Sequence, residues 1–211
     1  MKTIKTIIIL LFLSLVVTYG TRAQSFQVGL KGGVNFSNML IDDVDDENVR
    51  TGFHVGVLGK FLGANEIIGF QPELLYSTKG SKGQYDLADF EGEQKFNLNY
   101  IDLPLMLLIR LGVVDLNLGA YASYLVNSSV STEGDFLGDN SISLNKDNFN
   151  SFDYGLVGGL ALNFDIISIG ARYNYGLRQV AANTSSELFL GDARNNVAQV
   201  YIAFLFSDDE D

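Results

Sequence analysis

Apolar and polar residues alternate along most of this chain with a period of two. In the stretch ISIGARYNYGL, residues 167–177, every second side chain is apolar or aromatic. Such alternation predicts a β-strand with one apolar and one polar face. Eight segments of this kind follow one another without a linker or domain break, at about 25–37, 50–61, 67–79, 96–110, 115–127, 152–164, 167–178 and 196–206.

The connections between these segments are of two kinds. Those after the second, fourth and sixth segments are short, whereas the other connections are long and polar, for example NMLIDDVDDEN and SSVSTEGDFLGDNSISLNKDN. In an up-and-down barrel, alternate connections lie at the same end, so all short turns gather at one end. The sequence therefore predicts an all-β fold, an eight-stranded antiparallel up-and-down transmembrane β-barrel with short periplasmic turns and long extracellular loops.

Aromatic residues lie near both ends of the apolar faces. Three same-face pairs are eight to ten residues apart: Phe26 and Phe36, Phe53 and Phe61, Tyr154 and Phe164. At about 3.3 Å per residue and a tilt near 40°, each pair spans roughly 20–25 Å of height, close to the apolar band of an outer-membrane barrel. The alternative is a soluble barrel or sandwich with these aromatic residues in its core.

The opposite strand faces carry polar residues of both charge signs together with many glycines. Glycines beside long polar side chains fit the crowded interior of an eight-stranded barrel. We therefore expect Arg172 and Asn174 to point inward, and Ile169 and Tyr173 to face lipid. The predicted interior polar network consists of Lys31, His54, Lys60, Glu73, Asp102, Arg110, Asp153 and Arg172.

Buried charges are tolerated when they are paired. We expect the interior charges to pair with one another and to plug the barrel, with Arg172 close to Glu73 or Asp102. A narrow conduit lined by the same charges is the alternative.

The N-terminal segment predicts export. MKTIKTIIILLFLSLVVTYGTRA combines two lysines, an apolar run from Ile7 to Val17, and small residues at Thr21 and Ala23. This is the pattern of a secretory signal peptide, with a retained N-terminal anchor as the alternative. The predicted division is a signal peptide at 1–23, a barrel at 24–206 and an acidic tail at 207–211.

Charge and cysteine content exclude one class of partner and one source of stability. The signal carries three basic residues, so the remaining chain has 11 basic and 25 acidic residues, which argues against nucleic acid as a partner. The chain has no cysteine, so disulfide bonds do not stabilise this protein even though it is expected to be exported.

Few residues in this sequence suggest a catalytic or metal-binding site. His54 is the single histidine and has no nucleophile motif nearby, so we expect no catalytic residue. One histidine without cysteine gives poor support for a transition-metal site. The acidic run Asp42–Glu47 could offer oxygens to Ca²⁺, but it lacks the glycine of an EF-hand loop, and we expect a solvated loop. We expect neither a metal nor a cofactor.

Several stretches resemble one family. VGLKGGVNFSN, FQPELLYSTKG, NYIDLPLMLLIRLG, LNLGAYASYLV, DYGLVGGLALNF and IGARYNYGL are similar, in this order, to the PorT-like outer-membrane β-barrel family of Bacteroidetes-type bacteria. The resemblance implies an eight-stranded outer-membrane barrel, and one associated with protein secretion in its named member. It implies no catalytic residue. The chain departs from outer-membrane barrels that end in an aromatic residue, since Phe206 is followed by SDDED.

The expected function is that of an integral outer-membrane protein with a non-enzymatic structural or interaction role in the cell envelope. A narrow passive channel for small solutes and a soluble periplasmic barrel with an apolar ligand are the alternatives. Expected partners are outer-membrane lipid, the barrel-assembly machinery and proteins of an envelope or secretion complex.

Overall fold

The computed structural model describes residues 25–40, 49–87, 90–134, 140–143, 150–180 and 194–207. The predicted signal peptide, the acidic run at 42–47 and the tail after Ser207 lie outside these residues. The strands that close the barrel are β1 (Ser25–Leu40), β2 (Arg50–Leu62), β3 (Ile68–Leu87), β4 (Phe90–Leu111), β5 (Val114–Gly134), β7 (Phe152–Phe164), β8 (Ile167–Gln179) and β9 (Arg194–Ser207).

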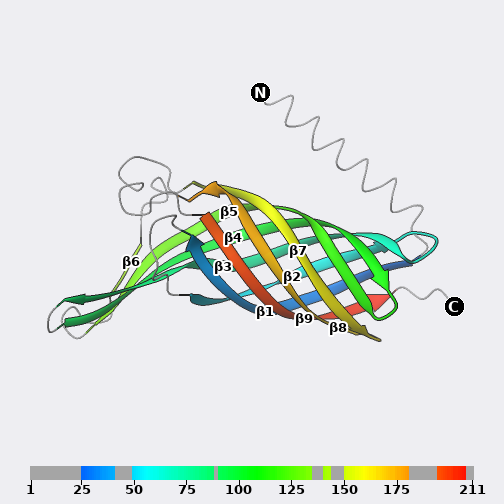
Figure 1. Cartoon of the computed structure of the whole chain (residues 1–211), viewed down its shortest axis with the longest axis horizontal. Coiled ribbons are helices and arrows are strands. Elements are labelled where there is room, and N and C mark those ends of the chain that lie inside the picture. Colours follow the sequence, from blue (N-terminus) through cyan, green and yellow to red (C-terminus); the bar gives the residue numbers. More distant parts are fainter. Residues whose placement is uncertain are drawn as a thin grey trace, which may run out of the picture.

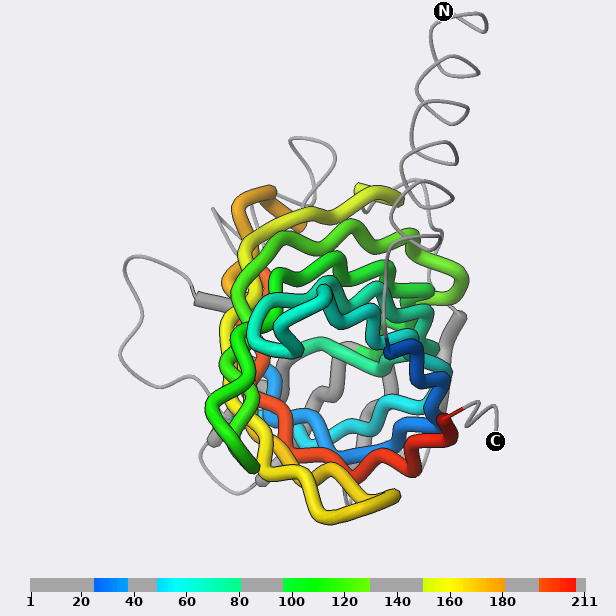
Figure 2. Tube along the Cα trace, turned by 90° about the vertical axis from the view of Figure 1, so that its right-hand side faces the viewer, coloured from blue at the N-terminus to red at the C-terminus, as the bar shows by residue number. Residues whose placement is uncertain are grey.

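These eight strands form a closed antiparallel barrel, as the sequence predicts. Each strand pairs with its neighbours along the chain, and β1 pairs with β9 to complete the circle. In that closing pair, Val28 lies opposite Phe206 and Val34 opposite Val200. Figure 2 looks along the barrel and shows the first and last strands side by side. A short ninth strand, β6 (Asn140–Ser143), pairs with β5 outside the closed circle.

The short connections gather at one end, together with the start of β1 and the end of β9 (Figure 1). Two of them are two-residue turns, Gly112–Val113 and Asp165–Ile166. Gly112 and Asp165 have φ values of 64° and 49°. Tight hairpin turns require positive φ, which glycine adopts freely and Asp tolerates better than most residues.

The two faces of each strand have opposite surroundings. In β8, buried and exposed residues alternate over most of the strand. Arg172 and Asn174 point inward and are buried, whereas Ile169 and Tyr173 are each 47% exposed. The predicted aromatic ends are outward as well, with Phe26 42% and Phe164 53% exposed.

This arrangement is inside out compared with a soluble barrel. Leucines stand fully on the outer surface, for example Leu118, which is 70% exposed, while charged residues fill the interior. An apolar outer band is what lipid contact requires, so the alternative of a soluble periplasmic barrel does not fit. No helix among the described residues is long and apolar enough to cross a membrane.

The sequence pattern predicts three strands shorter than they are, with the ends of β3 and β5 too early and the start of β4 too late. β3 and β4 continue as a paired hairpin to Leu87 and Phe90, where we predicted a long polar loop. β5 extends to Gly134, and β6 adds a fourth strand beside it. Figure 1 shows this extension, the outer ribbon, projecting beyond the barrel at the end opposite the short turns. The apolar alternation stops earlier because a strand outside the membrane has no lipid-facing side.

Candidate functional site

The barrel interior holds the densest set of charged groups among the described residues. They reach it because strand side chains alternate, so residues of one parity on each strand share the inner face. Three groups can be distinguished along the barrel. The central cluster comprises Lys31, Asn35, His54, Gln71, Glu73, Arg172 and Gln199. The turn-end cluster comprises Lys60, Arg110, Asp115 and Asn163. The outer cluster comprises Lys79, Tyr100, Asp102, Tyr121, Ser123, Asp153 and Asn195.

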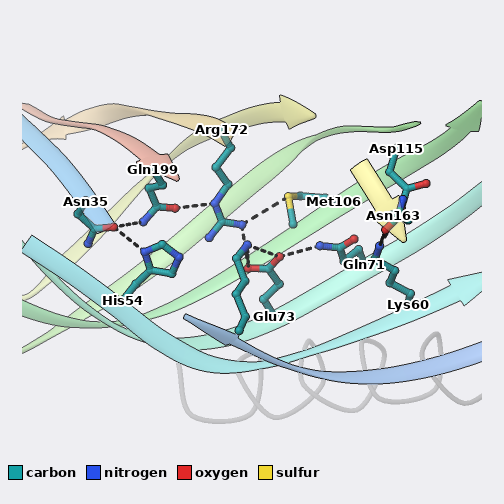
Figure 3. A network of polar contacts seen from close by, with 11 residues as sticks. Asn35, His54, Lys60, Gln71, Glu73, Met106, Asp115, Asn163, Arg172 and Gln199 are labelled. Atoms are coloured by element: carbon teal, nitrogen blue, oxygen red, sulfur yellow. Dashed lines mark hydrogen bonds and ion pairs between the residues drawn. The ribbon is translucent and has the colours of Figure 1, made fainter. Parts of the chain in front are cut away.

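Glu73 is the hub of the central cluster (Figure 3). Its carboxylate accepts hydrogen bonds from Lys31 Nζ at 3.0 and 3.1 Å, from Arg172 Nη1 at 2.8 Å and from Gln71 Nε2 at 2.7 Å. The Lys31 and Glu73 side chains are 0% exposed, and that of Arg172 is 3% exposed. One carboxylate thus pairs with two buried cations, from β1 and β8, and the three groups together carry one net positive charge.

A chain of side-chain amides continues from Arg172. Arg172 Nε donates to Gln199 Oε1 at 2.5 Å, and Gln199 Nε2 donates to Asn35 Oδ1 at 2.7 Å. His54 Nδ1 also lies 2.7 Å from Asn35 Oδ1. Because that oxygen can only accept, His54 must carry its proton on Nδ1. The direction of every bond in this chain is therefore fixed.

Tyr201 on β9 forms an aromatic wall of the central cluster. Lys31 Nζ lies 3.5 Å from the centroid of its ring, a cation–π contact, and the His54 ring meets it edge-on. Glycines provide the space for these large groups. A Cβ on Gly170 would lie 2.4 Å from Tyr201 Cζ, and one on Gly33 would lie 2.7 Å from His54 Cε1. Gly170 is thus required by the close approach of the Tyr201 ring, whereas at Gly33 a Cβ would also lie 2.2 Å from the backbone oxygen of Val200.

The turn-end cluster is organised around Asp115. Its carboxylate accepts from Lys60 Nζ at 2.8 Å and from Arg110 Nε and Nη2 at 2.9 and 3.3 Å. Lys60 also donates to Asn163 Oδ1 at 2.9 Å. The Arg110 side chain is 20% exposed, so this cluster borders the mouth at the short-turn end.

The outer cluster holds Lys79 between a carboxylate and two rings. Lys79 Nζ donates to Asp102 Oδ1 at 3.0 Å and to Ser123 Oγ at 3.1 Å. The same ammonium lies 4.9 Å from the ring centroids of both Tyr100 and Tyr121. All five side chains belong to residues that are at most 4% exposed.

Asp153 completes the outer cluster from β7. Its Oδ2 accepts from Tyr121 Oη at 3.4 Å and from Asn195 Nδ2 at 3.2 Å. Asn195 Nδ2 also donates to Tyr100 Oη at 3.2 Å. Asp153 is thus tied to the same two tyrosines that surround Lys79.

All eight residues of the predicted network lie on the inner side of the barrel wall. Lys31, Glu73 and Arg172 meet at the centre, and Lys60 and Arg110 meet at the turn end. Of the two partners we considered for Arg172, the structure has Glu73, while Asp102 pairs with Lys79.

Sequence reasoning missed several members of these clusters. Lys79 shares its strand face with Glu73, and Asp115 shares its face with Asn117, so residue parity alone would have included both. The buried tyrosines Tyr100, Tyr121 and Tyr201 are inward by the same parity. An aromatic residue on an otherwise polar face is the signal that was available.

The described residues contain no group of three or more His, Cys, Asp or Glu side chains placed to hold a metal ion. Around His54, the polar and ring contacts are with Asn35 and Tyr201. What this arrangement does physically is fill the barrel with cross-linked charges, as expected for an eight-stranded barrel whose interior just fits its side chains.

The fold and its polarity define an eight-stranded barrel of the Gram-negative outer membrane. The model of the outer membrane protein beta-barrel domain family matches residues 22–182, and the chain belongs to this family. No curated protein matches the chain.

Three solved outer-membrane proteins match the chain at low sequence identity. The attachment invasion locus protein Ail of Yersinia pestis, solved with the heparin analogue sucrose octasulfate, is 16% identical with a TM-score of 0.48, covering 87% of this chain and 100% of Ail. Neisserial surface protein A is 16% identical with a TM-score of 0.45, covering 86% and 97%. OprG from Pseudomonas aeruginosa is 14% identical with a TM-score of 0.32, covering 89% and 98%.

Proposed function

We propose that this outer-membrane barrel is a non-enzymatic anchor, closed along its axis, whose outer ribbon contacts other components of the cell envelope. The observation that carries the proposal is the bridge of Glu73 to Lys31 and Arg172 across the barrel interior. Three strands supply these groups, so the bridge stands in the path that a solute would take. Buried ion pairs are costly to separate, because each partner would be left uncompensated in a low-dielectric interior.

Measurements of ion conductance test whether the barrel is closed along its axis. The full chain, reconstituted in a planar lipid bilayer, is expected to give no steady current in salt solution. A reproducible unitary conductance that changes in Glu73→Gln would overturn the proposal and favour the narrow passive channel instead.

The outer ribbon is the second element of the proposal. The extended β3–β4 hairpin, with β5 and β6 beside it, makes a paired sheet beyond the barrel. Replacing residues 81–96 by an Asn-Gly turn joins the paired residues Gly80 and Asn97 and shortens this extension without a register shift, because an Asn-Gly pair closes a two-residue hairpin. The shortened barrel is expected to remain heat-modifiable on a cold detergent gel, while its cross-links to envelope proteins are lost. Cross-links that persist would show that contacts lie elsewhere.

The resemblance to PorT-like proteins makes a protein-secretion complex the first partner to test. In-cell cross-linking followed by mass spectrometry is expected to recover an envelope protein of such a complex with the full chain and not with the shortened ribbon. Recovery of porins and other abundant barrels alone would count against a secretion role.

The final strand supports the barrel-assembly machinery as a transient partner. Phe206 is 55% exposed on the outer face of β9, opposite Val28 of β1. We expect Phe206→Ala to lower the yield of heat-modifiable barrel in cells and to leave refolding of purified protein in detergent unchanged. An equal loss in both settings would indicate a packing role only.

A further inference from the structure

The outer cluster contains a buried carboxylate without a cation. Asp153 is 4% exposed, and its Oδ1 has no hydrogen-bond partner among the described residues. No lysine or arginine of the described strands lies within ion-pair distance of this carboxylate. The Asn195 amide, which donates to Oδ2, stabilises the charge in part. Burying an ionised carboxylate is very unfavourable unless a cation or hydrogen-bond donors compensate it.

The charges of the outer cluster indicate what charge a cation bound to Asp153 should carry. The outer cluster has two carboxylates, Asp102 and Asp153, and one ammonium, that of Lys79. Lys79 attracts Asp153 and Asp102 repels it, so the three charges interact. With both carboxylates ionised, the cluster carries one negative charge, and a single monovalent cation makes it neutral.

The way Lys79 is held shows which ligands suit a cation in this cluster. The ammonium has one carboxylate oxygen, one hydroxyl oxygen and two tyrosine rings around it. Asp153 is linked to these two tyrosines through Tyr121 Oη and Asn195. A second cation bound at Oδ1 would therefore lie among oxygen ligands and aromatic faces.

The charge of the chain around this end would supply cations. The chain segments that follow or precede the outer-cluster positions, residues 41–49, 81–96, 128–151 and 181–193, contain 15 acidic and 3 basic residues. Charge of one sign at the mouth of a site raises the local concentration of counter-ions.

We propose that the outer cluster binds one small monovalent cation through Asp153 Oδ1, next to Lys79. A divalent ion fits less well, because it would leave the cluster positive. In addition, the described residues offer no group of three acidic or histidine ligands to hold such an ion.

Thermal unfolding of the full chain in detergent micelles tests this site. At constant ionic strength, N-methylglucamine chloride is replaced stepwise by NaCl or KCl. A cation that binds only the folded state shifts the unfolding equilibrium, and a tenfold shift raises the midpoint by about 3–5 °C for a chain of this size. We expect this rise in the wild type and its loss in Asp153→Asn. The proposal would be overturned if the wild-type midpoint stays the same when Na⁺ or K⁺ replaces N-methylglucamine, or if Asp153→Asn shows the same rise as the wild type.

Two further variants sharpen the test. Asp165→Asn removes the same charge from an exposed turn at the other end, where Asn also tolerates positive φ, and it is expected to keep the full rise. Lys79→Gln leaves both carboxylates without an internal cation and is expected to increase the dependence on Na⁺. A loss of that dependence in Asp165→Asn, or its absence in Lys79→Gln, would count against the site.

Direct detection avoids the risk that Asp153→Asn fails to fold, which a cold detergent gel would reveal. Crystals of the wild-type protein grown with Tl⁺ are expected to show an anomalous peak within coordination distance of Asp153 Oδ1. Crystals without a peak there, at Tl⁺ concentrations that saturate the thermal shift, would overturn the assignment.

Discussion

The structure predicts a large loss of stability when Glu73 is replaced. Glu73→Gln keeps the shape and one oxygen but removes the carboxylate that, among the described residues, pairs with both Lys31 and Arg172. Removing one partner of a buried ion pair costs about 3–5 kcal/mol. Since two cations lose their partner here, we expect the loss of unfolding free energy to lie at the upper end of that range.

The charge count of the central cluster allows a second comparison. Lys31→Met leaves Glu73 and Arg172 as a one-to-one pair at 2.8 Å, because Arg172 Nη1 remains in place. Glu73→Gln instead leaves two cations and no anion. Removing the cation should therefore cost clearly less than removing the carboxylate, although both variants break the same 3.0 Å contact.

Urea titration of barrels in lipid vesicles, with the folded fraction measured on cold detergent gels, gives both values. Glu66→Gln is the matched control, since it makes the same chemical change in an exposed turn and should alter stability by no more than about 0.5 kcal/mol. If Glu73→Gln is as stable as this control, the central cluster does not carry charge in the way described. If Lys31→Met is the less stable of the two variants, the charge count is wrong.

Three further changes test the central cluster, the lipid face and a close-packed glycine. Arg172→Ala leaves Gln199 Oε1 without its donor but keeps Lys31 on Glu73, so in the same urea titration we expect a loss of about 1–3 kcal/mol, smaller than for Glu73→Gln. Leu118→Lys on the lipid face should cost about 2–4 kcal/mol near the bilayer midplane, and an unchanged urea midpoint would contradict lipid contact there. Gly170→Ala should cost about 1–3 kcal/mol because its methyl group overlaps the Tyr201 ring; a stability equal to wild type would show that the ring can move aside.

The strands and their faces could be predicted because lipid and interior impose opposite polarity on alternate residues. Ile169 and Arg172 illustrate this, since the first is 47% exposed outside and the second is buried inside. The same reasoning failed where lipid ends. Residues 80–87 pair regularly with β4, yet their sequence GSKGQYDL shows no sustained apolar alternation.

The partners inside the barrel could not be predicted from parity alone. Parity says that Arg172, Asp102 and Glu73 face inward, but which of them meet depends on strand register and on the stagger with which the barrel closes. Arg172 on β8 reaches Glu73 on β3 across 99 positions of sequence, whereas Asp102 meets Lys79 on the neighbouring strand. The sequence therefore identifies the inward-facing residues but does not say which of them are partners, because that depends on how the barrel closes.

The interior charges contribute to the uniqueness of the fold as well as to its stability. An apolar interior would make both faces of each strand alike, and a one-residue slip, which exchanges the faces, would then carry little penalty. With Lys31, Glu73 and Arg172 inside, the same slip places charges in lipid and leaves their partners unpaired. The turn-end bond from Lys60 to Asn163 acts in the same way over 103 positions, joining β2 to β7. The central and turn-end clusters therefore fix the register of strands that never pair with one another, while among the three clusters of described residues the outer one retains a carboxylate without a paired cation.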